Sequence, residues 1–331
     1  MKPYKYTKGD ATEYRTVKWK RRRFIKVKPR EKMALDGDTK EGQDQPYNDN
    51  PMKLTEHNRI LYPYYFGQEP RIQLENIKNI QSKTGDIFVC SYPKSGTHWI
   101  MEMVNMLVAG STEHPIKFNF LDPMIICDQV LDSVPCPRIF QSHLRFSQLP
   151  DSFLKRKGKI IYILRNPKDV SVSLYNFVQK EGRMKYSGAW DECFQLFISG
   201  NVAYSSWFDH VLSWEREKEK GRHPIHFVFY EDLKEDAVRE LDRISKFLSL
   251  NHPNSFLESV AESSTFTKMR NQKYLYHPFP AEVMDENYVD FLFRRGIVGD
   301  WRAWFSEEQS NQLDAVYKAE MSGSKLIFSY G

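Results

Sequence analysis

Short apolar runs of strand length alternate with helical segments over most of the chain, and this alternation limits the possible folds more than any other feature. The run Asp86–Tyr92 is followed by a turn that contains a proline and a glycine, and the apolar spacing from Trp99 to Val108 is helical. Three further runs have the composition of buried strands: Arg138–Ser142, Lys159–Leu164 and Ile225–Tyr230.

Helical spacing returns between and after these strands. Four segments have it: Lys168–Gln179, Ala189–Gly200, Tyr204–Lys220 and Ala237–Leu248. Strands separated by helices form parallel sheets that are covered on both faces. The sequence therefore predicts an α/β fold, with a single domain and a central parallel sheet flanked by helices.

The charge of the chain is concentrated at its N-terminus. Residues 1–32 contain thirteen Lys or Arg against three acids, whereas the whole chain has a net charge of only +5. The overall basicity is therefore no evidence that the folded body binds nucleic acid. We expect residues 1–50 to be a basic flexible extension and residues 51–331 to be the folded domain. The basic stretch Lys18–Lys26 could bind RNA, an anionic membrane or an import receptor, and a solvated charged tail is the favoured interpretation.

Two negative features predict the compartment. The sequence lacks a run of about 18–20 apolar residues, as a membrane span requires, and no apolar run typical of a secretory signal lies near the N-terminus. Only four cysteines occur, and none has Cys-x-x-Cys spacing. This usage is typical of a reduced intracellular protein without a zinc site. We therefore expect a cytoplasmic protein with no membrane span and no bound metal.

The first candidate site is the loop Pro93–Trp99, between the first strand and the helix that follows it. Backbone N–H groups at a helix N-terminus attract anions, Gly96 allows close approach of a phosphate, and Lys94 adds a mobile charge. In nucleotide triphosphatases the glycine precedes the lysine, and that order places magnesium. Here Lys94 precedes Gly96, which disfavours a P-loop kinase.

A second candidate site follows the strand Lys159–Leu164. Arg165 lies at the carboxyl end of this strand, which is the edge where ligands bind in open α/β sheets. Asp169 is interpreted as an N-cap or first-turn acid of the next helix. Ser173 lies one turn further along, on the same side as Asp169. A phosphate held by Arg165 and Ser173 would explain this pairing.

The third candidate site is Phe293–Trp301, which contains Arg294, Arg295, Gly296 and a second glycine. Two adjacent arginines with nearby glycines suit a loop around a phosphate. Taken alone, the same segment could equally be a solvated turn.

These three segments, together with Phe229–Leu233 and in this order and spacing, resemble the cytosolic sulfotransferase family over roughly residues 66–328. The resemblance implies that residues 51–331 form a sulfotransferase domain with a P-loop-like nucleotide-binding architecture. It implies transfer of a sulfonate from 3′-phosphoadenosine 5′-phosphosulfate (PAPS) to the hydroxyl or amine of a small acceptor, as in the conjugation of xenobiotics. No metal is implied.

The resemblance also implies roles for individual residues. The 5′-phosphosulfate would be held by Lys94, Ser95, Gly96, Thr97, His98 and Trp99, with Trp99 stacking on the adenine. The 3′-phosphate would be held by Arg165, Ser173, Arg294, Arg295 and Gly296. The adenine side would be lined by Tyr230, Ser264, Thr265 and Phe266. His143 matches the catalytic base, and an imidazole with an ordinary pKa near ~6.5 is available in its neutral form at neutral pH. Lys94 can neutralise charge that develops on the leaving phosphate.

The chain departs from the family pattern at several positions. Gln141 stands where phenol-type members carry a lysine, and His98 replaces a threonine or asparagine. The dimer motif of the family aligns with Arg302, Ser306, Glu307 and Asn311, which match it poorly. We therefore expect a monomer or a weak homodimer, with no need for nucleic acid.

The acceptor is the least determined part of the prediction. Three irregular segments would line its pocket, namely Phe118–Ile126, Met184–Trp190 and Tyr274–Val283, and each could instead fill the core. Such a pocket favours an apolar acceptor such as a phenol, a steroid or another alcohol. The alternative function is a catalytically inactive nucleotide-binding or adaptor protein of the same fold. His143 favours the enzyme, because nucleotide binding alone does not need it.

Overall fold

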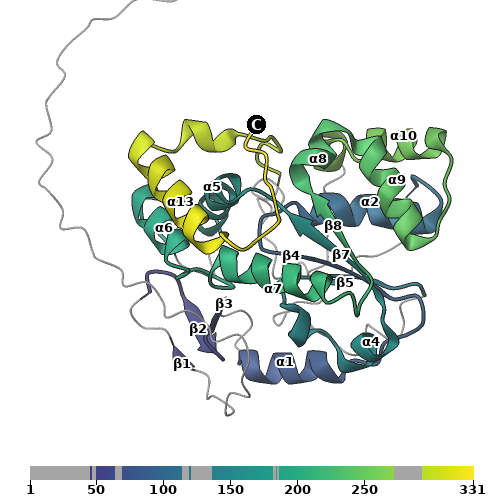
Figure 1. The fold of residues 1–331 in the computed structure, drawn as a ribbon, viewed down its shortest axis with the longest axis horizontal. Coiled ribbons are helices and arrows are strands. Elements are labelled where there is room, and N and C mark those ends of the chain that lie inside the picture. The colour runs from purple at the N-terminus through teal and green to yellow at the C-terminus, as the bar shows by residue number, and fades with distance from the viewer. Residues whose placement is uncertain are drawn as a thin grey trace, which may run out of the picture.

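A five-stranded parallel sheet forms the centre of the computed structural model (Figure 1), which describes residues 45–46, 50–63, 69–113, 119–120, 136–181, 184, 186–271 and 293–331. The strand order is β5-β6-β4-β7-β8, and every neighbouring pair is parallel. The strands are β4 (Ile87–Ser91), β5 (Asn119–Phe120), β6 (Ile139–Ser142), β7 (Lys159–Leu164) and β8 (Ile225–Phe229). The predicted fold class is confirmed.

Helices cover both faces of this sheet. One side carries α2 (Thr97–Ala109), α8 (Tyr230–Glu235), α9 (Ala237–Leu248) and α10 (Asn254–Ser263). The other side carries α1 (Pro70–Asn79), α4 (Asp151–Arg156), α5 (Pro167–Val178), α6 (Trp190–Ile198), α7 (Trp207–Glu219) and α13 (Glu307–Glu320). Two further helical segments are α11 (Phe266–Asn271) and the 3-10 turn Asp300–Ala303, and another 3-10 turn spans Phe146–Gln148.

Two separate apolar cores follow from the alternation of side chains along the strands. Along β4, Phe88 and Cys90 belong to the core beneath α1 and α5–α7, whereas Ile87 and Val89 belong to the core beneath α2 and α9. Successive side chains of a strand point to opposite faces, so a strand buried on both faces is apolar throughout. This is why uninterrupted apolar runs predicted these strands.

The four predicted helices between and after the strands are present, with one boundary to correct. The helix predicted from Tyr204 begins at Trp207, because Tyr204 and Ser205 have left-handed backbones with φ of 66° and 62°. Ser206 then caps α7 by accepting a hydrogen bond from the backbone N–H of Asp209. The helix therefore starts three residues later than its apolar pattern indicates.

A small antiparallel sheet precedes the main one and was not predicted. It consists of β1 (Gln45–Pro46), β2 (Leu54–His57) and β3 (Ile60–Pro63). The two residues between β2 and β3, Asn58 and Arg59, have φ of 48° and 60°, as a tight hairpin turn requires. Strand β1 belongs to the segment predicted as an extension, and residues 1–44 and 47–49 lie outside the described residues. The domain boundary at residue 50 stays a prediction.

Two of the residues aligned with the family's dimer motif, Arg302 and Ser306, have roles inside this chain. Arg302 donates to the carbonyl oxygens of Tyr330 and Gly331, at 2.8 and 2.5 Å. Ser306 caps α13 through the backbone N–H of Gln309, and the Gln309 side chain accepts the N–H of Ser306 in return. These contacts hold the C-terminal segment and start a helix, so the structure gives both residues an intramolecular function.

Across the described ranges, no helix is both long enough and apolar enough to cross a membrane. The same ranges contain no group of three or more His, Cys, Asp or Glu side chains that could hold a metal ion.

A buried ion pair joins the starts of two central strands. Arg138 donates through Nε and Nη2 to the two carboxylate oxygens of Asp86, at 3.0 and 2.6 Å, and both side chains are 1% exposed. The N–H of Ile87 donates to the carbonyl of Arg138 at 2.9 Å. A side-chain pair and a backbone bond therefore fix the same end of β4 and β6.

We predict that Asp86→Ala lowers the free energy of unfolding by about 3–5 kcal/mol, because it leaves the Arg138 guanidinium buried without its partner. Urea unfolding measures the change. Asp86→Ala combined with Arg138→Met should recover a substantial part of the loss, since no charge is then buried. A double variant no more stable than Asp86→Ala would contradict this explanation.

Candidate functional site

The loop between β4 and α2 has a backbone that only a special sequence tolerates. Lys94 and Gly96 have positive φ, 69° and 100°, and Ser95 between them does not. Alternation of this kind turns successive N–H groups towards one side and forms a concavity for anions. A Cβ at Gly96 would lie 2.7 Å from a ring carbon of Tyr230, so only glycine fits there. The predicted phosphate loop therefore has the required local geometry.

An aromatic wall stands beside this loop and joins residues predicted to lie on the adenine side. Trp99 donates from Nε1 to the carbonyl oxygen of Ser264 at 2.8 Å, and its ring meets that of Tyr230 edge to face, with centroids 5.4 Å apart. The Lys234 ammonium lies 5.0 Å from the Trp99 ring. Ser264 contributes its backbone here, since its hydroxyl donates back into α10.

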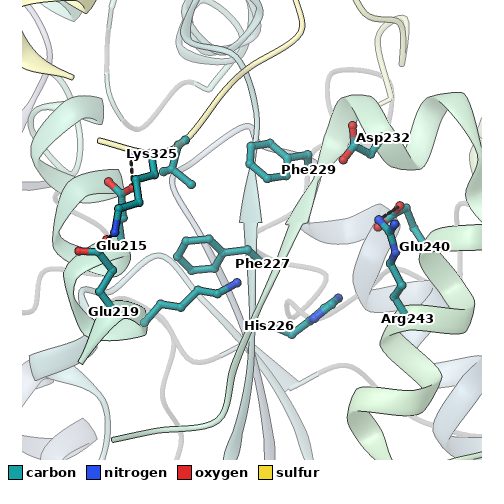
Figure 2. Close-up of a pocket in the computed structure, with 11 residues that line it drawn as sticks. Glu215, Glu219, His226, Phe227, Phe229, Asp232, Glu240, Arg243 and Lys325 are labelled. Atoms are coloured by element: carbon teal, nitrogen blue, oxygen red, sulfur yellow. Dashed lines mark hydrogen bonds and ion pairs between the residues drawn. The ribbon is translucent and has the colours of Figure 1, made fainter. Parts of the chain in front are cut away.

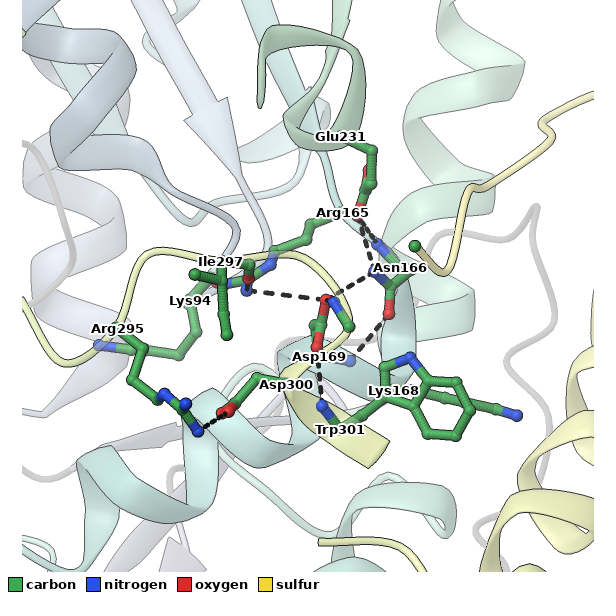
Figure 3. A network of polar contacts seen from close by, with 12 residues as sticks. Lys94, Arg165, Asn166, Lys168, Asp169, Glu231, Arg295, Ile297, Asp300 and Trp301 are labelled. Atoms are coloured by element: carbon green, nitrogen blue, oxygen red, sulfur yellow. Dashed lines mark hydrogen bonds and ion pairs between the residues drawn. The ribbon is translucent and has the colours of Figure 1, made fainter. Parts of the chain in front are cut away.

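Arg165 connects the predicted sites to one another. Its guanidinium donates to the carbonyl oxygen of Lys94 and to that of Ile297, each at 3.1 Å, and lies 4.3 Å from the centre of the Tyr230 ring. Asp169 lies 3.9 Å from its Nη2. The Nε atom of Arg165 is buried without a hydrogen-bond partner in the described part of the chain. Arg165 therefore links both loops through its terminal nitrogens, and its Nε–H makes no hydrogen bond within the described residues (Figure 3).

The carboxylate of Asp169 holds the loop near the C-terminus against α5. It accepts the backbone N–H groups of Gly299 and Trp301, at 2.9 and 3.1 Å, and the side-chain amide of Asn166 at 3.0 Å. Asn166, not Asp169, is the N-cap, and its amide also donates to Glu231. Asp169 is thus a first-turn acid with a structural role, as one of the two predicted alternatives stated.

Arg294 and Arg295 both make ion pairs with Asp300, and the Arg295 contact is 2.6 Å long. Asp300 is buried, whereas the Arg295 side chain is 53% exposed. Gly296 has a φ of 64°, and a Cβ there would lie 2.5 Å from the ring of Phe266. Asp300 therefore orients two cations that the sequence analysis predicted, although that analysis gave Asp300 itself no role.

His143 follows β6 and lies against the end of β4. Its Nδ1 is 3.0 Å from the carbonyl oxygen of Ser91, and its ring meets that of Tyr204 edge to face. Because a carbonyl only accepts, this contact assigns the proton to Nδ1 and leaves the lone pair of the neutral ring on Nε2. The neighbouring Gln141 is buried, with an amide nitrogen that has no partner in the described part of the chain.

Positive groups crowd around the loop and shift one another's pKa. Burial lowers the pKa of Lys94 to about 7, and the charges of Arg165 and Arg294 add to this effect. Burial lowers the pKa of His143 to about 4, opposed by its bond to a backbone carbonyl and assisted by Lys94. The pKa of His98 is lowered to about 3 by burial, and the charges of Lys94 and His143 add to this effect. Burial is the largest cause of all three shifts, and the like charges add to it, a combination that suits the binding of an anion.

The predicted hydroxyl groups lie in several environments. Ser95 and Thr97 are buried, and the Thr97 hydroxyl is 2.7 Å from that of Ser91. Thr265 is exposed, whereas Ser173 is half-buried on α5, four residues after Asp169. The sequence analysis gave no role to Asn166 or Glu231. The Asn166 amide donates to Asp169 and to Glu231, and the Glu231 carboxylate also accepts the backbone N–H of Asn166, the residue after Arg165.

The predicted acceptor segments are described only in part. Phe118–Ile126, apart from the strand residues Asn119–Phe120, lies outside the described residues, as does Tyr274–Val283. In the third segment, Met184 and Tyr186 are buried in the main apolar core.

Two cavities lie away from Lys94, Arg165 and His143. One, of about 530 Å³, opens beside the outer edge of β8 between α7 and α9, with Phe227 and Phe229 as its apolar part (Figure 2). The other lies at the amino ends of β4 and β7. Neither contains a predicted site residue, so neither is assigned to the acceptor.

Comparison with known proteins identifies the family. The family model described as the sulfotransferase domain matches residues 84–325. Sulfotransferase 1B1 of Canis lupus familiaris is 38% identical over 267 residues, covering 77% of this chain and 89% of its own. Sulfotransferase 6B1 of Danio rerio is 33% identical over 281 residues, covering 83% and 90%. The chain belongs to the sulfotransferase family.

Solved structures agree with this assignment. The mouse sulfotransferase SULT7A1, crystallised in complex with PAP, is 30% identical, with a TM-score of 0.68 over 82% of this chain and 96% of its own. Retinol dehydratase in complex with retinol and PAP has a TM-score of 0.69 at 20% identity, over 86% and 94% of the two chains. At that identity, the second likeness shows the fold alone.

We predict that Asp169→Asn loosens the loop around residues 293–301, because an amide replaces one of its acceptor oxygens and removes the charge that strengthens both backbone bonds. The free energy of opening this loop should fall by about 1.5–3 kcal/mol. Faster amide hydrogen exchange at Gly299 and Trp301 measures this decrease. Asp242→Asn is the matched control, since Asp242 pairs with Lys246 on the exposed face of α9, away from the loop. Equal loss of protection in both variants would refute the role given to Asp169.

Proposed function

We propose that the chain transfers the sulfonate group of PAPS to the hydroxyl or amine of a small apolar acceptor such as a phenol, a steroid or another alcohol. Its co-substrate is PAPS, and the enzyme is a PAPS-dependent sulfotransferase. The observation that carries the proposal is the position of Arg165, which hydrogen-bonds both to the Lys94 loop and to the loop containing Ile297.

The residues present suit a donor that carries phosphate at two ends. The loop from Lys94 to Trp99 would hold the 5′-phosphosulfate through Ser95, Thr97 and the backbone concavity. The cations at the other end are Arg165 and the pair Arg294 and Arg295, which would hold the 3′-phosphate together with Ser173 and Gly296. A buried donor atom on Arg165 without a partner is the kind of group that a bound anion satisfies.

The aromatic wall suits the base of the nucleotide. Trp99, Tyr230 and Phe266 lie between the two anion-binding loops, and Ser264 and Thr265 complete this side. Flat rings beside a cationic site suit stacking on a heterocycle.

His143 suits the role of general base. The Nδ1 contact with the Ser91 carbonyl orients the ring, and a lowered pKa keeps the imidazole neutral at neutral pH. His143 Nε2 takes the proton of the acceptor hydroxyl while the acceptor oxygen forms a bond to sulfur. The bond between sulfur and the bridging oxygen breaks, and the 5′-phosphate leaves with that electron pair.

Lys94 suits the stabilisation of this leaving group. Its ammonium lies 4.0 Å from the centre of the Phe177 ring on α5, and its charge repels those of Arg165 and Arg294. Negative charge that grows on the leaving phosphate relieves the repulsion, so the interaction strengthens as the reaction proceeds.

We predict that His143→Ala lowers kcat by at least about a hundredfold, the usual contribution of a general base, and leaves the dissociation constant for adenosine 3′,5′-bisphosphate within about twofold. Single-turnover assays and calorimetry measure the two quantities. His226→Ala is the control, because His226 lies beside α9 and away from the loop. Unchanged turnover in His143→Ala would favour the inactive nucleotide-binding alternative, and parallel loss of binding would mean that the residue is misassigned.

We predict that affinity for the same bisphosphate falls several-fold from pH 7 to pH 9. The pKa of free Lys94 is about 7, and a bound anion raises it, so binding takes up a proton that becomes scarce as the pH rises. Phosphate ionisation is nearly complete above pH ~7, so it does not obscure this trend. Lys94→Met should bind more weakly with a flat profile. An equal slope in Lys94→Met would show that another group titrates.

A further inference from the structure

A cavity of about 500 Å³ opens at the amino ends of β4 and β7, opposite the edge that carries Lys94 and Arg165. It is formed by the segment before β4, the end of α4 and the turn after α9, and Figure 1 shows α4 beside that end of the sheet. The volume lies within the range of small-molecule sites. No step of sulfonate transfer uses this part of the fold.

The side chains around the cavity carry an excess of positive charge. Four of them are cationic: Lys83, Arg156, Lys157 and Lys159. The single acid, Asp86, is buried and already accepts two hydrogen bonds from Arg138. Its charge is therefore compensated from within the core.

Three of the four cations make no ion pair with a described carboxylate. Arg156 and Lys157 are exposed, and the Lys159 ammonium donates to the hydroxyl of Ser249 at 2.9 Å, a contact with a neutral group. Many other surface cations of the chain are paired, for example Lys78 with Asp151. The mouth of the cavity thus keeps a net positive charge.

The interior of the cavity is apolar. It is lined by Ile87, Val108, Pro137, Phe153, Leu248 and Leu250. Ile87, Phe153 and Leu248 are less than 9% exposed, so they form a fixed wall that belongs to the two cores. An apolar recess with a cationic rim complements a ligand that has a carbon skeleton at one end and an anionic group at the other.

We propose that this cavity is a second ligand site, which binds a small amphipathic anion with its apolar part against Val108 and Leu250, the half-buried apolar residues of its lining, and its anionic group at Arg156 and Lys157. Two sources share this chemistry. One is the sulfate ester that sulfonate transfer produces, and naming it rests on the proposed function. The other is a medium-chain carboxylate, and naming it does not rest on the proposed function.

The test is equilibrium dialysis of the full-length protein, saturated with adenosine 3′,5′-bisphosphate so that the anion site at Lys94 is filled. The probes are 1-naphthyl sulfate and decanoate. In the Arg156→Glu/Lys157→Glu variant, the dissociation constant of one bound molecule of each probe should rise by about tenfold at low salt. The reason is the reversal of two exposed charges. Lys155→Glu is the matched control, an exposed cation of the same helix that does not line the cavity, and we expect less than a twofold change.

Two further probes test the two halves of the proposed ligand. Neither 1-naphthyl methyl ether, which has no charge, nor inorganic sulfate, which has no carbon skeleton, should bind as tightly as 1-naphthyl sulfate. Equal affinity for either of them would overturn the proposal, as would affinities that the double charge reversal leaves unchanged. Tighter binding of 1-naphthyl sulfate than of decanoate would identify the ester as the source, and the reverse would identify the carboxylate even if the proposed function fails.

Discussion

One buried carboxylate brings together segments that are 130 residues apart. Asp169 accepts the N–H groups of Gly299 and Trp301 from the first turn of α5, so the loop with Arg294 and Arg295 is fixed to the same helix that follows Arg165. A carboxylate that accepts backbone N–H groups makes stronger bonds than a neutral acceptor does. Two loops that are each only weak indicators of a phosphate site therefore meet at one place.

Much of the fold could be predicted because its central strands are buried on both faces. Their continuous apolar runs and the amphipathic pattern of α9 are strong local signals. The elements that were missed lack such a signal. Only Leu313 of α13 is buried, so that helix has almost no apolar face to detect, and α7 starts late because two residues take a left-handed backbone that its apolar pattern does not indicate.

For the candidate site, the sequence indicates residue types that suit an anion but not the contacts that position them. Lys94, Arg165 and the adjacent arginines stand in segments whose spacing and local sequence suggest anion binding. The partners that position them are mostly main-chain atoms, such as the carbonyls of Lys94 and Ile297, and any residue type supplies a carbonyl. Asn166 acts partly through the tertiary structure, because its amide donates to Glu231 on a distant helix. Asp300 pairs with Arg294 and Arg295 of its own segment, and no regular spacing in the sequence indicates that contact.

The way the cations are held explains how the site can be both stable and reactive. Arg165 has its shortest contacts with two neutral carbonyls, and its distance to Asp169 is 3.9 Å, so its charge is less compensated than those of Arg294 and Arg295. Lys94 is likewise placed beside a ring, and burial lowers its pKa, with the like charges of Arg165 and Arg294 adding to the effect. Repulsion of this kind lowers the stability of the free protein, and a bound anion removes it. The same arrangement of cations therefore lowers the stability of the free protein and provides its affinity for a phosphorylated donor. A chain that neutralised these cations with carboxylates would gain stability and lose the site.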